Sequence, residues 1–213
     1  LFDRMGIDNV RVLPPRDSRD LPAVGPNTRY LLAQPFLSDT AMALEGRGAV
    51  RLDAMFPFGA EGTTDWLAAA AREFAIDEAL FEQVVAPGRE RALKAMAHLR
   101  SQLEGRRISF LPDSQLEVPL ARFLTSELGM VPVEVGTPYL HRAHCARDLA
   151  RIPESARISE GQHVDLQLDR VREDRPDLTV CGLGLANPLE AEGLSTKWAI
   201  ELVFSPIHGF DQA

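Results

Sequence analysis

Short apolar runs alternate along the chain with longer segments in which apolar residues recur every three or four positions. The short runs predict β-strands at residues 10–13, 29–33, 49–56, 108–111, 131–136 and 178–181. The longer segments predict helices between these strands. Strands that alternate with helices are typical of crossover units, so the pattern predicts an α/β fold of Rossmann-like units, with mostly parallel sheets flanked by helices.

Two helices in the first half of the chain have clear packing faces. One begins at about Thr64, and the other follows Pro87 and ends before Gly105. The residues expected to face inward are Leu67, Ala70, Ala71 and Phe74 in the first helix, and Leu93, Met96, Ala97 and Leu103 in the second. A shorter helix before them is expected to have Ser38 as its N-cap and to stop at Gly46.

A second α/β unit begins with the strand at residues 108–111. Ser114 and Glu117 then have the spacing of a capping box, and Asp113 has the better claim to a capping role than to a ligand site. Pro119 lies too deep for a free first-turn proline and is expected to kink the helix that carries Leu116, Leu120, Phe123, Leu124 and Leu128. Further helices are expected to end at Leu149 and to span 164–173. These patterns predict two domains, residues 1–95 and 96–213, with the boundary in the long helix near residues 90–105.

Composition excludes several classes of partner. A formal net charge of -8 and a pI near 5.2 argue against a nonspecific grip on nucleic acid or on an anionic membrane. No apolar stretch approaches the roughly 20 residues that a membrane span needs.

Cys145 and Cys181 lack a C-x-x-C partner, so a disulfide framework is not expected and a reducing cytoplasm is favoured. Because the chain starts at Leu1 rather than Met, we expect a fragment of a longer chain.

The stretch "VCGLGLANPLEAEGLSTKW" contains a candidate nucleotide fingerprint. Gly182 and Gly184 match its first two glycines, and Glu201 lies near the distance of a ribose-binding acid. The third glycine is replaced by Asn187, and Pro188 follows where a helix should already be running. A tight turn from strand to loop is therefore the favoured interpretation.

Two other clusters have plain structural explanations. His141, His144 and Cys145 in "HRAHC" would share one helical face and supply half of a metal site, but the other half is not apparent in the sequence. An amphipathic helix surface is favoured instead. Glu190 and Glu192 are two positions apart, so on a helix they would not face each other. No G-x-S-x-G elbow or Walker loop occurs, which removes the basis for hydrolase or ATPase chemistry in this segment.

An apolar segment near the end of the chain is the remaining candidate. Trp198 and Phe204 bracket Ile200, Leu202 and Val203, after a turn at the carboxyl end of a predicted strand. The segment is explained equally well as plain core or as a cavity wall. As a wall it would suit a flat conjugated ligand, because aromatic rings offer wide, rigid stacking faces. Gly182 and Gly184 would then bend the chain toward such a ligand.

Six stretches carry a family resemblance. They are "GAEGTTDWL", "FLPDSQLEVPLARFLTSELGM", "VEVGTPYLHR", "SEGQHVDLQLDR", "RPDLTVCGLGLANPLEAEGLSTKW" and "IELVFSPIHGFDQA". Together they resemble the N subunits of light-independent protochlorophyllide reductases, a nitrogenase-like family of chlorophyll and bacteriochlorophyll synthesis. The resemblance extends over residues 1–213 and is most specific in the last hundred. It implies the middle and C-terminal part of such a subunit, with a nitrogenase component-like fold.

The resemblance implies partners and cofactors beyond this segment. Such subunits form a heterotetramer of two N and two B chains, which receives electrons from subunit L, an ATP-hydrolysing iron-sulfur protein. A 4Fe-4S cluster is expected in the N-B complex, with its N-side cysteines upstream, and neither Cys145 nor Cys181 matches one. A metal-binding histidine of the wider superfamily would fall at about Ala199, so the pocket is expected to be free for an organic substrate.

The implied reaction adds two electrons and two protons across one double bond of ring D of protochlorophyllide. Trp198 and Phe204 are expected to form the apolar substrate wall, and we assign no catalytic acid and no metal ligand in this segment. Four alternatives remain open at this stage. They are a chlorophyllide reductase subunit, a nitrogenase cofactor scaffold, a nicotinamide-dependent dehydrogenase built on Gly182, Gly184 and Glu201, and a non-catalytic interaction module.

Overall fold

Five parallel strands form the main sheet, in the order β5-β4-β3-β6-β7. The computed structural model describes residues 1–161 and 163–212. The strands of this sheet are β3 (Arg107–Phe110), β4 (Val131–Thr137), β5 (Arg157–Glu160), β6 (Leu178–Cys181) and β7 (Thr196–Trp198). The chain proceeds outward from β3 to β5 and then returns to β6 on the other side of β3. The expected mostly parallel α/β architecture is confirmed.

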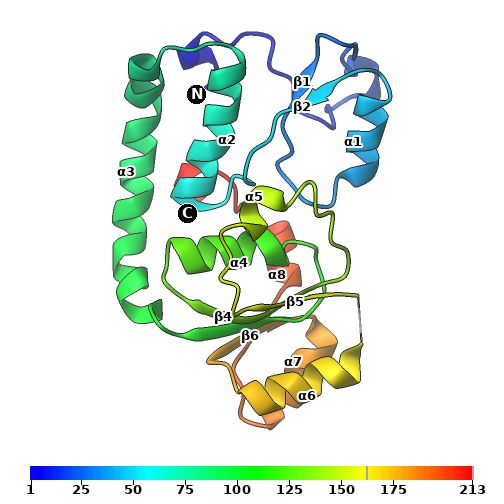
Figure 1. The fold of residues 1–213 in the computed structure, drawn as a ribbon, viewed down its shortest axis with the longest axis vertical. Helices are drawn as coiled ribbons and strands as arrows, with labels where there is room; N and C mark the ends of the chain where they lie inside the picture. Colours follow the sequence, from blue (N-terminus) through cyan, green and yellow to red (C-terminus); the bar gives the residue numbers. More distant parts are fainter. Residues whose placement is uncertain (162, 213) are drawn as a thin grey trace.

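Helices cover both faces of this sheet (Figure 1). One face carries α4 (Glu117–Ser126), α5 (Ala146–Leu149) and α8 (Ile200–Phe204), and the other carries α6 (Val164–Asp174) and α7 (Leu183–Ala191). The second face buries a small apolar cluster of Leu111, Val171, Cys181, Ala186, Leu189 and Leu194. The predicted helix at 164–173 and the strand at 178–181 are confirmed, because their patterns match the face that each one buries.

The first half of the chain adds a helical pair and a small sheet (Figure 1). Helix α3 (Glu78–Leu103) lies along one side of the molecule beside α2 (Gly59–Glu73). The small parallel sheet joins β1 (Arg29–Tyr30) to β2 (Val50–Arg51), with α1 (Ser38–Glu45) beside it. The remaining elements are 3-10 turns, η1 (Asp3–Met5), η2 (Ser18–Asp20) and η3 (Phe210–Gln212). Among the helices of the described residues, none combines the length and the apolar composition of a membrane-spanning segment.

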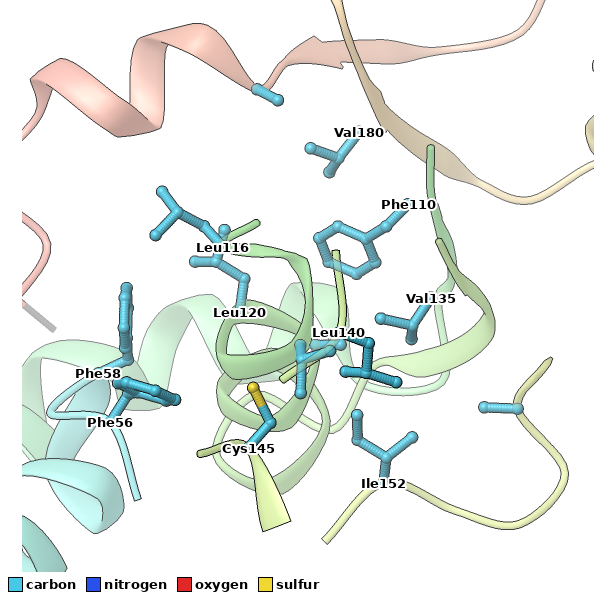
Figure 2. Packing of buried hydrophobic residues seen from close by; sticks show 14 of the residues in the cluster. Phe56, Phe58, Phe110, Leu116, Leu120, Val135, Leu140, Cys145, Ile152 and Val180 are labelled. Carbon is cyan, nitrogen blue, oxygen red and sulfur yellow. The ribbon is translucent and has the colours of Figure 1, made fainter. Parts of the chain in front are cut away.

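Two larger cores organise the molecule. The first lies between the main sheet and α4 and includes Phe56, Phe58, Phe110, Leu120 and Val180 (Figure 2). The second lies between α2 and α3 and includes Leu67, Ala70, Phe81, Val85, Met96 and Phe210. Phe210 comes from the C-terminal end of the described chain and packs on the α2–α3 pair. The division at residues 95 and 96 stays a prediction, and α3 continues without a break through that point.

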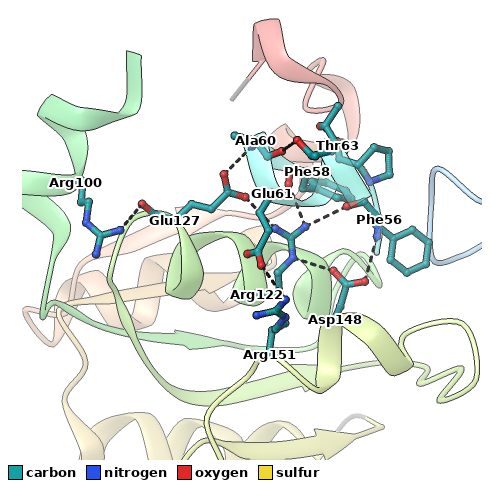
Figure 3. Close-up of polar contacts among 12 residues, drawn as sticks. Phe56, Phe58, Ala60, Glu61, Thr63, Arg100, Arg122, Glu127, Asp148 and Arg151 are labelled. Carbon is teal, nitrogen blue, oxygen red and sulfur yellow. Dashed lines mark hydrogen bonds and ion pairs between the residues drawn. The ribbon is translucent and has the colours of Figure 1, made fainter. Parts of the chain in front are cut away.

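A buried ionic cluster joins the segment before α2 to the main sheet's helices (Figure 3). Arg122 of α4 pairs through Nη1 with Oε1 of Glu127 at 3.0 Å and through Nε with Oδ1 of Asp148 at 3.0 Å. Its Nη2 donates to the carbonyl oxygens of Phe56 and Phe58, at 3.1 and 3.0 Å. Burial raises the pKa of the Glu127 carboxyl, and the Arg122 charge offsets only part of that effect. One guanidinium therefore holds three chain segments together.

Several predictions about strands were wrong. Residues 10–13 form no strand, and Val12 is largely exposed, because no neighbouring segment in the described chain pairs with them. The strands expected at 29–33 and 49–56 shorten to the two-residue strands β1 and β2, which pair only with each other. A strand forms only where a partner supplies hydrogen bonds, and local pattern cannot show that.

The two long helices also differ from expectation at specific positions. Helix α2 begins at Gly59 rather than Thr64, and Phe74 is its exposed C-cap residue. Helix α3 includes Pro87, which lies on the exposed side, where water can satisfy the carbonyl that loses its partner. Its buried side includes Phe81, Val84, Val85, Gly88, Ala92 and Met96, so Leu93 and Ala97 face outward. The packing of α3 on α2 decides this face.

The short helix α1 shows a smaller difference. It ends before Gly46 as expected, but its N-cap is Leu37, and Ser38 is the first helical residue. The Ser38 side chain therefore does not have the expected N-cap role.

Candidate functional site

The carboxyl ends of β3, β6 and β7 lie at one edge of the main sheet. Strand β6 pairs with β3 on one side and with β7 on the other, and Cys181 is the register partner of Trp198. Because neighbouring strands lie about 4.8 Å apart, the ends of β3 and β7 are separated by about 10 Å. The crossovers leave in opposite directions at β3 and β6, and α/β folds bind ligands at such a switch point.

Gly182 makes room for a carboxyl group from the neighbouring strand. A Cβ atom added at Gly182 would lie 2.9 Å from Oδ1 of Asp113, which follows β3. Burial raises the pKa of the Asp113 carboxyl. At Gly184 an added Cβ would meet nothing within 4 Å. The small residue at position 182 thus leaves room for the Asp113 carboxyl, and this close approach needs no phosphate.

The chain after Gly182 differs from the prediction. The favoured strand-to-loop turn is wrong, since Gly182 is the N-cap of α7 and the helix continues through Pro188. Glu201, the candidate ribose-binding acid, forms an ion pair with Lys197. The geometry therefore has a strand, a glycine and a helix in the expected order for a nucleotide site, but its acid already has a partner.

The turn after β3 is organised by Glu117 rather than by Asp113. Oε1 of Glu117 accepts from the backbone N–H groups of Asp113 and Ser114, at 2.9 and 2.6 Å. The predicted role of Glu117 in the capping box is therefore confirmed. The Ser114 hydroxyl accepts from the N–H of Leu116 at 3.3 Å and not from that of Glu117, so the predicted capping role of the Ser114 side chain is wrong. The predicted kink is also wrong: α4 begins at Glu117, which places Pro119 in the first turn, where its missing N–H has no helical acceptor.

The two predicted wall residues are both accessible. Trp198 is 38% exposed at the end of β7, and Phe204 is 82% exposed at the end of α8. Among the described residues no ring contact joins them. Ala199 lies between them and is buried, and its N–H donates to the carbonyl of Cys181 at 2.9 Å. Whether the two rings form a substrate wall stays a prediction.

The "HRAHC" stretch is a turn rather than a helix. His141 and His144 stack with ring centroids 5.4 Å apart, while Cys145 packs into the first core (Figure 2). Burial lowers the pKa of His144. In the described part of the chain, no group of three or more His, Cys, Asp or Glu residues could hold a metal ion. The expected helix surface is therefore wrong, and the imidazoles and the thiol lie in different environments.

The carboxylates of Glu190 and Glu192 do not face a common site. Glu190 accepts a hydrogen bond from the Thr196 hydroxyl, and Glu192 pairs with Arg172 at 2.8 Å. Each carboxylate thus has its own partner on a different element. This agrees with the expectation that the two acids do not act as a catalytic pair.

The cysteines are poor candidates for thiolate ligands. Burial raises the pKa of the Cys145 thiol to about 12 and that of Cys181 to about 11. A metal or cluster ligand must be deprotonated, and that state is strongly disfavoured at both positions. They also lie in different apolar clusters, on opposite faces of the main sheet.

Sequence reasoning missed two features of this edge. One is the close approach of Asp113 to Gly182, two residues that follow different strands far apart in the chain. The other is Lys197, which lies opposite Val180 in the sheet and lines a cavity with it. Because side chains alternate along a strand, Trp198 points to the other face. The alternation of Thr196, Lys197 and Trp198 was the available signal, but it needed the pairing partner to be interpreted.

Comparisons with known proteins show which sequences this chain resembles. The chain is 66% identical over 213 residues to the light-independent protochlorophyllide reductase subunit N of Rhodospirillum rubrum, and covers 48% of that protein. It is 65% identical to the subunit of the same name from Rubrivivax gelatinosus, and covers 50% of it. The chain thus spans about half the length of the curated relatives it matches.

A solved structure supports the fold. The chain resembles "Nitrogenase Cp1 at pH 6.5" with a TM-score of 0.65 and 17% sequence identity, over 87% of this chain and 42% of that one. At this identity the likeness concerns the fold alone. The family model described as "Nitrogenase component 1 type Oxidoreductase" matches residues 1–213. Since that match covers every residue, this chain belongs to the nitrogenase component 1 type oxidoreductases.

Proposed function

We propose that this chain is part of the N subunit of a light-independent protochlorophyllide reductase, and that it helps to bind protochlorophyllide while ring D is reduced. The observation that carries the proposal is the 66% and 65% identity, over the whole chain, to proteins of that name. In this activity two electrons and two protons add across one double bond, and the product is chlorophyllide.

Trp198 and Phe204 would contribute the apolar surface for the pigment. Trp198 ends β7 at the carboxyl edge of the main sheet, Phe204 ends α8, and both rings are accessible. An indole and a phenyl ring can stack on a flat tetrapyrrole, hold its orientation and exclude water from it. Because the rings do not touch each other within this chain, the complete site would need further surface from the rest of the N chain and from the B chain of the heterotetramer.

The family implies an iron-sulfur cluster in the assembled complex. The residues described here do not fit one, because Cys145 and Cys181 are buried with raised thiol pKa values and lie on opposite faces of the sheet. We therefore place the ligands of a 4Fe-4S cluster outside this segment. Electrons would come from subunit L, which would bind and hydrolyse ATP and dock transiently on a heterotetramer of two N and two B chains.

Pigment binding tests the proposal. Trp198→Ala and Phe204→Ala are made in the full N-B complex, and protochlorophyllide is titrated by absorbance. Each substitution is expected to weaken binding more than tenfold, since a stacked aromatic ring can contribute about 2 kcal/mol or more. Phe74→Ala is the matched control, because Phe74 is similarly exposed but lies at the end of α2. Unchanged affinity in both edge variants would remove these rings from the site.

A further inference from the structure

A cavity of about 260 Å³ lies between the main sheet, α4 and the segment from α8 to the C-terminal turn. Four of its lining residues, Phe58, Phe110, Leu120 and Val180, are drawn in Figure 2 among the side chains of the first core. Leu202 and Ile207 line it from the C-terminal segment. Among the described residues that line it, the only polar side chains are those of Lys197 and Gln212.

The cavity opens partly to solvent, but its apolar lining is poorly suited to water. Protein cores are packed so closely that voids larger than a water molecule are few. Apolar walls also offer water too few hydrogen bonds to hold it in place. The cavity is therefore suited to an apolar occupant.

Its volume limits the size of that occupant. One water molecule occupies about 30 Å³ in the liquid, so the cavity has room for about nine non-hydrogen atoms. A whole tetrapyrrole is far larger than this. A medium-length alkyl chain, or one substituted edge of a flat ring system, would fit.

Lys197 gives the cavity a single cationic group. It is one of two lysines in the chain, and its strand position opposite Val180 turns it toward the cavity. Its ammonium pairs with Glu201, and both side chains are about half exposed, at 47% and 48%. An ion pair this exposed is worth little, and a lysine has three donors. The ammonium can therefore also bind a carboxylate at the cavity edge.

We propose that this cavity binds the apolar body of a carboxylate-bearing ligand, with Lys197 holding the carboxylate at its edge. Two sources share this chemistry. One is a free medium-chain carboxylic acid. The other is a propionate-bearing edge of the pigment, and this second source rests on the proposed function, whereas the first does not.

Octanoate and 1-octanol serve as probes on the full chain, titrated by isothermal calorimetry. Both are expected to bind, and octanoate more tightly. Lys197→Met is expected to weaken octanoate roughly threefold to tenfold and to leave octanol unchanged, as expected for one partly exposed charge pair. Lys94→Met is the matched control, because it removes the other lysine, which lies exposed on α3. Leu202→Phe fills the cavity and is expected to abolish binding of both probes.

Two results would overturn the proposal. Failure of both probes to bind the unmodified chain overturns the proposal, and so does an equal loss of octanoate and octanol in Lys197→Met. Protochlorophyllide is then added to the octanoate-loaded N-B complex. Displacement of octanoate identifies the pigment edge as the ligand, and simultaneous binding identifies a separate acid. If the pigment does not bind at all, the proposed function fails while the octanoate result still stands.

Discussion

The Nε atom of Arg122 lies 3.0 Å from Oδ1 of Asp148, and neither side chain is exposed to solvent. Oδ2 of Asp148 in turn accepts from the N–H of Phe56 at 3.1 Å. This relationship fixes α5 against α4 and ties both to the segment that precedes α2 (Figure 3). A buried charge is tolerated here because each of its polar neighbours is also paired.

Replacement of Arg122 by Met is expected to destabilise the fold by about 3–5 kcal/mol. The change leaves two buried carboxylates without their cation, which is the costly way to break a buried ion pair. Arg172→Met is the matched control, because its pair with Glu192 is exposed and its loss is expected to change stability little. Urea unfolding measures both. If Arg122→Met does not fold, Asp148→Asn is measured in its place, and a cost no larger than that of the control would contradict the prediction.

Two glycine substitutions are expected to have opposite effects. A Cβ at Gly62 would lie 2.3 Å from both Nη2 of Arg122 and the carbonyl oxygen of Phe56. The backbone oxygen cannot move freely, so Gly62→Ala should cost at least about 2 kcal/mol. Gly184 has open space around it and lies inside α7, so Gly184→Ala should stabilise by about 0.5 kcal/mol through helix propensity. Thermal denaturation of the two variants checks the signs, and a stable Gly62→Ala variant would contradict the predicted clash.

Glu134 should make stability depend on pH. Burial alone would raise its pKa, but Arg170, Ser159 and Arg157 together hold the carboxyl pKa below its ordinary value of 4.5. A lowered folded pKa means that the contribution is complete above the unfolded pKa and is lost as pH falls through the folded one. Glu134→Gln should therefore cost about 2 kcal/mol at pH 7 and progressively less below pH 4. Urea unfolding at pH 7 and at a pH below 4 measures the loss of unfolding free energy. Glu154→Gln, in an exposed loop, is the control.

Both cysteines should resist alkylation while the chain is folded. The thiolate is the reactive species, and thiol pKa values of about 12 for Cys145 and about 11 for Cys181 leave very little of it at pH 8. Iodoacetamide labelling followed by mass spectrometry is expected to be at least about 100-fold slower than in guanidinium. Rapid labelling of Cys181 in the folded chain would show that the cluster beside α7 opens in solution.

Much of the second α/β unit could be predicted from the local pattern of apolar and polar residues. The strand at residues 178–181 and the helix before it, α6, were predicted within a residue or two, because each buries one apolar face. The long helix α3 was located less well. Its true buried side includes Ala92 and Met96, and the exposed Leu93 fits the same spacing one residue away. Periodicity gave two faces of similar quality, and only packing on α2 separates them.

The sequence by itself determined the α/β class and the family resemblance, because both depend on residue types and their spacing along the chain. Only the tertiary structure decided that Asp113 lies against Gly182, that Arg122 is fully buried, and that Lys197 and Val180 share a cavity. The physical reason is that such contacts depend on which strands pair and in which register. Pairing is a property of the assembled sheet, and no single strand encodes its neighbour.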